Sequence, residues 1–153
     1  MNNLFSLKQA VHDACVSTLQ ERIEQAVAGM EQARESSTAD TKSSAGDKHE
    51  TARAMAQLEL EKQAVALGNL REMEHVLQRI DPSQRCTAIV PGSLVSTDQG
   101  TYYISAAAGK LDVEGTTVMA ISMQAPIVEF LKGIAPSGSG KFNGRKVKLL
   151  SVA

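Results

Sequence analysis

The sequence predicts an α+β protein in which two long helices precede a small antiparallel sheet with one short helix. Three observations support this class. Apolar residues recur every three or four positions through most of residues 4–80, a proline follows at position 82, and short apolar runs divided by glycines fill the remainder. A three- and four-residue repeat indicates one face of a helix, whereas short runs between turn residues indicate strands. We therefore expect a helical part over 1–81 and a sheet-containing part over 82–153.

The first long helix is expected from Leu4 to about Arg34. Its apolar repeat comprises Leu4, Leu7, Val11, Cys15, Leu19, Ile23, Ala26, Met30 and Ala33. These steps place the side chains in one stripe along the helix and leave the other faces polar. The Ser/Thr-rich segment "ESSTADTKSSAGD" follows and is expected to form the connection to the second helix.

The second long helix is expected to end before Pro82, which stops a helix. Its repeat comprises Ala56, Leu60, Ala64, Leu67, Leu70, Met73, Leu77 and Ile80. Two narrow stripes can be buried only against each other or against a partner, which predicts an antiparallel coiled-coil hairpin. Roughly 30 residues per helix at about 1.5 Å each give a rod of about 45 Å, with its tip near residues 36–50.

Five runs after Pro82 are expected to be strands of an antiparallel sheet. They read "CTAIV", "SLVST", "TYYISAA", "TTVMAIS" and "RKVKLLSV". Between the last two, "APIVEFLKG" predicts a short helix, because Pro126 suits a first turn and Gly133 suits an end.

Composition excludes several classes of protein. The 153 residues carry a net charge of -1, only 3% are aromatic and none is Trp, which disfavours nucleic-acid binding by bulk electrostatics and a pocket of stacked rings. Cys15 and Cys86 form no Cys-x-x-Cys pair, so neither a disulfide framework nor a zinc site is expected. No apolar run approaches the roughly 18 residues of a membrane span and no signal peptide is visible, so we expect a cytoplasmic protein.

The end of the chain is locally basic. After Glu129 there are five cations and no acidic residue, the cations being Lys132, Lys141, Arg145, Lys146 and Lys148. Such a segment either keeps a surface solvated or meets an acidic partner.

Sites for self-contained chemistry are not evident. The run "APSGSGKF" lacks the first glycine and the Ser/Thr of a phosphate loop, and the residues after it alternate like a strand. His12, His49 and His75 are scattered, and the pair His12 and Cys15, one helical turn apart, is more often packing than a metal site. We therefore expect neither an enzyme nor a small-molecule substrate.

The stretch "SSAGDKHETARA", residues 43–54, raises a question about its two carboxylates. An Asp at a helix start with a Glu three positions later forms a capping box, so Asp47 and Glu50 taken alone mark the beginning of a helix. A turn at the end of a rod has almost no core to serve, which leaves room for a functional role.

Two motifs resemble the Gre family of bacterial transcript-cleavage factors. In that family a Gly-Asp-x-x-Glu-Asn-Ala stretch begins the second helix, and Gly46, Asp47, Glu50 and Ala52 stand here at the same spacing, with Thr51 at the Asn position.

The second motif is "AISMQAPIVEFLKG", which is similar to that family's strand, Ser-Pro and short helix. Ala125 replaces the Ser, while Pro126 and Gly133 remain. Arg53 and Ala54 depart from the acidic residue and Tyr often found there in the family.

The resemblance implies an FKBP-like C-terminal domain that holds the rim of the RNA polymerase secondary channel, while the hairpin enters the channel. Asp47 and Glu50 would help to hold a second Mg²⁺ in the polymerase active centre, and the 3′ end of the backtracked nascent RNA would be cut. The protein would be a monomeric cofactor of an enzyme. The residues expected to meet the polymerase are Pro126, Lys132, Lys141 and Arg145.

Three alternatives remain open. One is a Gre-like channel regulator without cleavage activity. Another is an FKBP-like prolyl isomerase, against which the four rings of Tyr102, Tyr103, Phe130 and Phe142 count as too few and too dispersed. The third is a plain coiled-coil adaptor, in which Asp47 and Glu50 would only cap a helix.

Overall fold

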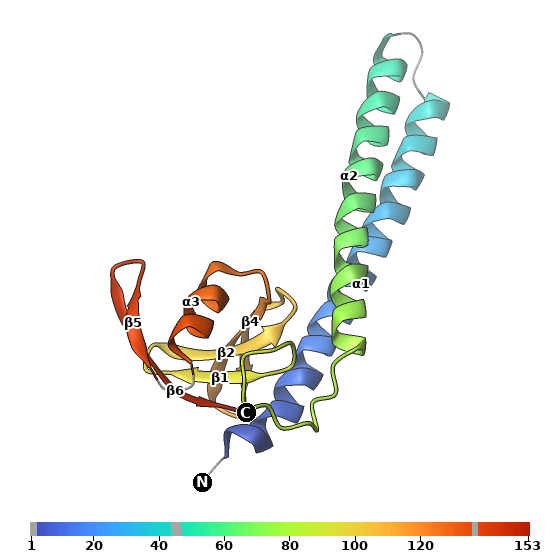
Figure 1. The fold of residues 1–153 in the computed structure, drawn as a ribbon. Helices are drawn as coiled ribbons and strands as arrows, with labels where there is room; N and C mark the ends of the chain where they lie inside the picture. The colour runs from blue at the N-terminus through green and yellow to red at the C-terminus, as the bar shows by residue number, and fades with distance from the viewer. Residues whose placement is uncertain (1–2, 44–46, 136–137) are drawn as a thin grey trace. The chain divides into compact units, whose positions relative to one another are not determined.

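The chain has the α+β order that the sequence predicts. The computed structural model describes residues 3–43, 47–135 and 138–153, with side chains described outside 36–49. Helices α1 (Leu4–Ser43) and α2 (Asp47–Gln78) precede the sheet, and the short helix α3 (Pro126–Ile134) lies between its fourth and fifth strands (Figure 1). The strands are β1 (Leu94–Thr97), β2 (Gly100–Ser105), β3 (Gly109–Val113), β4 (Thr116–Ser122), β5 (Ser139–Phe142) and β6 (Arg145–Val152).

Helix α1 runs farther than its apolar repeat predicts. It continues to Ser43, so residues 36–43 of the Ser/Thr-rich segment are helical, and the expectation of a connection there was wrong. Ser and Thr lower helix propensity only by several tenths of a kcal/mol each, which an established helix tolerates. Residues 44–46, which include Gly46, lie outside the described residues.

Contacts divide the chain into two compact units. The first, which we call the sheet unit, contains Met1–Thr18 and Met73–Ala153, and the second, the helical unit, contains Leu19–Glu72. The beginning of α1 and the end of α2 therefore belong with the sheet by contacts. The division of the chain at 81/82 stays a prediction about independent domains.

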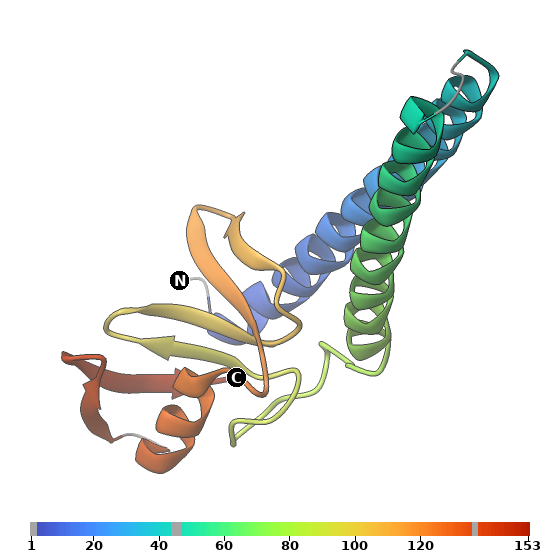
Figure 2. The same cartoon turned by 90° about the horizontal axis from the view of Figure 1, so that it is seen from above.

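In the helical unit α1 and α2 lie side by side in both views (Figures 1 and 2). The half-buried positions of α2 are Ala52, Ala56, Leu60, Gln63, Leu67 and Leu70. Gln63 thus takes the inner place expected for Ala64, which is exposed. Gln63 lies close to α1 there, since a Cβ on Gly29 would lie 2.8 Å from Gln63 Oε1.

The sheet has six strands in the order β3-β4-β2-β1-β6-β5. All neighbours are antiparallel except β2 and β4, which are parallel, with Tyr103 opposite Ala120. The expectation of a wholly antiparallel sheet was therefore wrong. The cause is β3, a strand between β2 and β4 in sequence that lies at the sheet edge, so that the chain reverses twice before β4 pairs with β2.

Two strands were missed and one expected strand is absent. The run "CTAIV" has no strand, and after it Ser93 Oγ donates a 2.8 Å hydrogen bond to Val90 O in the turn before β1. Strands β3 and β5 belong to hairpins whose two-residue turns, Glu114-Gly115 and Asn143-Gly144, both have positive φ. This conformation matches the twist of neighbouring strands and favours Asn-Gly, a signal that the sequence did contain.

The sheet unit is packed on both faces. On one face α3 buries Val128 and Leu131 against Val95, Ile104 and other core residues. Residues of a strand alternate between faces, so Tyr103 of β2 points away from Ile104. Tyr103 is fully buried, and its hydroxyl oxygen lies 2.7 Å from Nδ1 of His12, which places the start of α1 on the opposite face.

Candidate functional site

The two predicted metal ligands lie in the first turn of α2. The helix begins at Asp47 and includes Glu50, and residues three apart in a helix lie on the same side. Glu50 is exposed, whereas the side chain of Asp47 lies outside the described residues. A helix N-terminus also favours carboxylates electrostatically, so this position suits the pair whether it caps the helix or binds a cation. The metal role stays a prediction.

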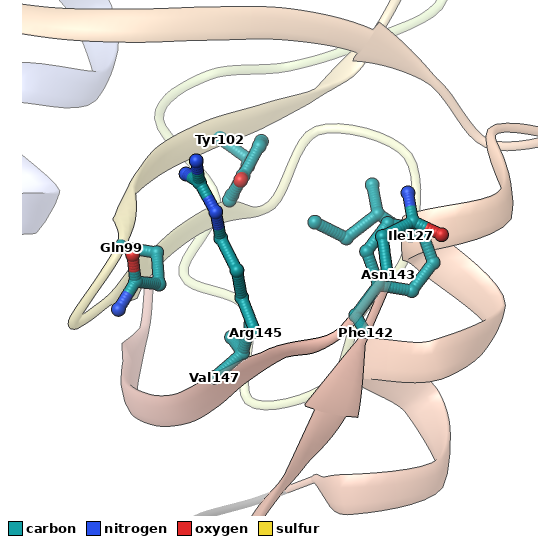
Figure 3. Close-up of a pocket in the computed structure, with 7 residues that line it drawn as sticks. All are labelled: Gln99, Tyr102, Ile127, Phe142, Asn143, Arg145 and Val147. Atoms are coloured by element: carbon teal, nitrogen blue, oxygen red, sulfur yellow. The ribbon is translucent and has the colours of Figure 1, made fainter.

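A pocket of about 320 Å³ opens on the α3 face of the sheet unit (Figure 3). Its walls come from the β1–β2 turn, β2, α3 and the β5–β6 hairpin, and the lining residues are Gln99, Tyr102, Ile127, Phe142, Asn143, Arg145 and Val147. Figure 3 shows the Arg145 side chain extending from β6 toward Tyr102. The pocket combines apolar walls with a guanidinium and two amides, which suits a peptide segment that carries apolar and acidic groups.

The aromatic residues are less dispersed than the sequence suggests. Tyr102 and Phe142 line the same pocket, and the Phe130 ring lies 5.5 Å from the Phe142 ring between centroids. Only Tyr103 points to the other face, where it meets His12. Two of the four rings that the sequence suggested were too dispersed to line a pocket therefore share one, because the β5–β6 hairpin brings residue 142 back beside β2 and α3.

The predicted partner-binding residues are all exposed but do not share one face. Pro126 opens α3, and Lys132 near its end lies 3.7 Å from Glu129, an exposed ion pair of small energetic effect. Strand β6 alternates, so Arg145 lies with Val147 at the pocket while its neighbour Lys146 points to the other side.

Three lysines gather on that other side of the β5–β6 hairpin. Lys141 and Lys146 are direct cross-strand partners, and Lys148 follows two residues along. We call Lys141, Lys146 and Lys148 the lysine face. Like charges directly opposite each other destabilise a strand pair, and among the described residues no ion pair is seen for these lysines. An anionic partner would relieve this repulsion.

The run "APSGSGKF" does not enclose a phosphate. Its last four residues form β5, and the residues after Asn143 and Gly144 form β6 rather than a helix. The strand that the sequence analysis used to reject a phosphate loop is therefore confirmed. Residues 136 and 137 lie outside the described part of the chain.

A buried polar cluster lies between α1 and β2, where the sequence indicated packing for His12 and Cys15 but no contact with Tyr103. His12 is 8% exposed and meets Tyr103, and Cys15 one turn later is fully buried. Burial lowers the pKa of His12 below its ordinary 6.5, against the opposite effect of Asp13 and Asp81. Among the described residues no three His, Cys, Asp or Glu side chains could together hold a metal ion. Lys8 and His12 are one helical turn apart in α1, and both are buried although neither belongs to the apolar stripe. The buried face of α1 is therefore wider than that stripe, and the spacing of the two residues was the sequence signal for this.

Stability should fall as the pH drops below about 6.5, because of His12. The folded-state pKa is lowered, so the unfolded chain takes up the proton first, and the loss is complete once the pH is below the folded-state value. Thermal unfolding measured from about pH 7.5 to about pH 5.5 should show a falling Tm.

The variant His12→Gln should flatten this dependence, since an amide can still accept a hydrogen bond from Tyr103. His75→Gln, at an exposed position of α2, is the matched control and should leave the slope unchanged. A slope that survives in His12→Gln would contradict the assignment. Hydrogen bonds from Ser83 are the main cause that lowers the pKa of Asp81 from its ordinary 3.8. Protonation of Asp81 therefore changes stability only at a pH below about 3.8, outside the range of this measurement.

Within the described residues, no helix is long and apolar enough to cross a membrane.

Comparisons with known proteins add no relative. Searches against protein families, characterised proteins and solved structures find no match to this chain.

Proposed function

We propose that this protein is a Gre-like transcription factor that inserts its helical hairpin into the secondary channel of RNA polymerase and stimulates cleavage of backtracked RNA. The observation that carries the proposal is the position of Asp47 and Glu50 in the first turn of α2, directly after the chain reverses between two long helices. A turn at the end of a helical hairpin has almost no core to serve, which leaves room for a functional role of these two residues.

The helical unit supports the hairpin role. Its part of α1, from Leu19 to Ser43, is about 37 Å long at 1.5 Å per residue. From Ala56 to Leu70 the half-buried positions of α2 recur at alternating steps of four and three, the spacing of a coiled-coil seam. On its outer side Met55, Leu58 and Val65 are each about two-thirds exposed. Apolar side chains on this outer side would be covered in a channel.

The sheet unit supports the docking role. A sheet with one short helix on one face and a pocket beside that helix fits an FKBP-like domain. Arg145 and the lysine face flank the β5–β6 hairpin on its two sides, and either could meet an acidic surface at the rim of the channel.

The proposed chemistry belongs to the polymerase. Magnesium binds through one or two carboxylates and keeps several waters, so Asp47 and Glu50 alone would form a weak site and would need further ligands from the active centre. Asp47 and Glu50 would hold a second magnesium ion there and orient the attacking water, and the ion would supply charge stabilisation for phosphodiester hydrolysis. The protein itself would then be a monomeric, cytoplasmic cofactor of an enzyme.

The proposal predicts release of short 3′-terminal RNA fragments when the protein is added to stalled elongation complexes of the cognate polymerase. The measurement is gel analysis of RNA labelled at its 3′ end, with and without the protein, in magnesium-containing buffer. Binding without cleavage would identify the non-cleaving channel regulator instead. Absence of binding would overturn the proposal.

One observation favours the prolyl isomerase alternative: Tyr102 and Phe142 line the same pocket. Catalysed cis/trans exchange of a proline peptide, lost in Tyr102→Ala, would favour it. Fold alone does not confer that activity.

A further inference from the structure

Lys8 is an unusual lysine because none of its surface is exposed. Its Nζ lies 2.7 Å from Gln84 O, 3.2 Å from Ala153 O and 3.4 Å from Cys86 Sγ. An ammonium group has three donors, so these contacts use all of them and hold the nitrogen beside the sulfur. All four residues belong to the sheet unit.

Cys86 itself is partly exposed and borders a pocket. Cys86 is half-buried and lines a pocket of about 370 Å³ together with Phe5, Arg85 and Ser151. Arg85 Cζ lies 4.1 Å from the centre of the Phe5 ring, so the side chain is held over the ring beside the pocket. A small oxidant can therefore reach the sulfur while the Lys8 nitrogen stays within contact distance.

We propose that Lys8 and Cys86 form a covalent, reversible N–O–S bridge when the protein meets hydrogen peroxide. The sulfur attacks one peroxide, an S–O bond forms, the O–O bond breaks, and a sulfenic acid and one water result. The sulfenic acid then exchanges its hydroxyl group for the hydroperoxyl group of a second peroxide, which gives S–O–OH and releases a second water.

The Lys8 ammonium gives a proton to the terminal oxygen of S–O–OH, and the resulting amine attacks the oxygen that is bound to sulfur. An N–O bond forms, the O–O bond breaks, a third water leaves, and the bridging nitrogen releases one proton. In total one thiol, one amine and two peroxides give one bridge and three waters, so sulfur and nitrogen lose four electrons and the two peroxides gain them. Two molecules of a dithiol reductant supply four electrons, return the amine and the thiol, and release the bridging oxygen as water. The geometry favours this product over a direct S–N bond, which would require a larger movement of Nζ from its other two partners.

The second cysteine provides a contrast within the same chain. Cys15 is fully buried, and burial raises the pKa of its thiol to about 11. Peroxides react with accessible thiolates, so Cys15 should stay reduced under conditions that oxidise Cys86.

Intact-mass spectrometry of the full chain after peroxide treatment should show the gain of one oxygen and the loss of two hydrogens. Trypsin should then fail to cut after Lys8, and residues 1–22 should be found linked to residues 86–110. Cys15 in the linked peptide should still be alkylated by iodoacetamide after denaturation. Dithiothreitol should separate the two peptides and restore cleavage at Lys8.

Three variants control this experiment. Cys15→Ser should still form the bridge, whereas Cys86→Ser and Lys8→Arg should not. Lys8→Arg keeps a cation in the buried position, and its circular dichroism and Tm without peroxide report whether it folds. In the chain without substitutions the bridge should also raise the Tm, because it ties the start of α1 to the segment after α2.

Several results would overturn the proposal. Oxidation of Cys86 to sulfinic or sulfonic acid without linkage would show that Lys8 does not react. A linked peptide in which trypsin has cut after Lys8 would indicate a Cys15–Cys86 disulfide. The same linkage in Lys8→Arg would also exclude the bridge, and these readouts do not depend on polymerase binding.

Discussion

Replacing Asp47 with Asn and Glu50 with Gln in one chain is expected to abolish stimulated RNA cleavage while leaving polymerase binding nearly unchanged. The amides keep the shape of the side chains and can still accept capping hydrogen bonds, but they lack the negative charges that magnesium requires. Loss of a helix cap costs only about 1 kcal/mol, which the long helix α2 should survive. Cleavage and binding are measured on the same stalled complexes.

The matched control is Glu59→Gln, an exposed acidic position of α2 farther along the helix. It removes one charge from the hairpin without touching the first turn, and should cleave normally. Undiminished cleavage by the double variant would return Asp47 and Glu50 to a capping role. A parallel fall in cleavage and binding would mean that the carboxylates dock the hairpin instead of serving the chemistry.

Replacing Lys141 with Glu should weaken polymerase binding about tenfold and at the same time slightly stabilise the free protein. The Glu would stand directly opposite Lys146, so a repulsive cross-strand pair becomes an attractive one worth roughly 0.2–1 kcal/mol. A damaged fold would lower both binding and stability, whereas weaker binding together with higher stability indicates the loss of an interaction with the polymerase. Binding is measured by titration and stability by thermal unfolding.

The control for this variant is Lys110→Glu, because Lys110 is an exposed cation on the edge strand β3 with an uncharged partner, Met119. It changes the net charge equally and should bind normally. The defect of Lys141→Glu should also shrink as salt rises, since exposed charges are screened beyond about 8 Å at physiological ionic strength. Equal losses in the two variants would show that only the overall charge matters, and the lysine face would then be merely solvated.

Local patterns predicted the helices well. The apolar repeats of α1 and α2 and the Pro126 start of α3 depend on contacts between residues three or four apart, which the sequence states directly. The α+β class followed from the same patterns. The position of Asp47 at the start of α2 was also predicted, because helix starts have a local chemical signature.

The strands were harder to predict because their pairing is not local. β3 alternates Leu111 and Val113 inward, and its hairpin turn is visible in the sequence, yet nothing within the segment says that it lies at the sheet edge. That placement made β2 and β4 parallel. It depends on which strands bury their apolar faces together, and this is decided by the whole sheet.

The sequence by itself determined the two long helices, the α+β class and the position of the carboxylate pair at a helix start, because these depend on backbone preferences and on neighbours within one or two turns. Only the tertiary structure decided that Lys8 is buried beside Cys86, that Tyr102 and Arg145 share a pocket, and that the basic residues of β6 divide between two faces. These features join side chains from segments far apart in the chain. Their energies come from burial and pairing in three dimensions, which no local pattern of residues encodes.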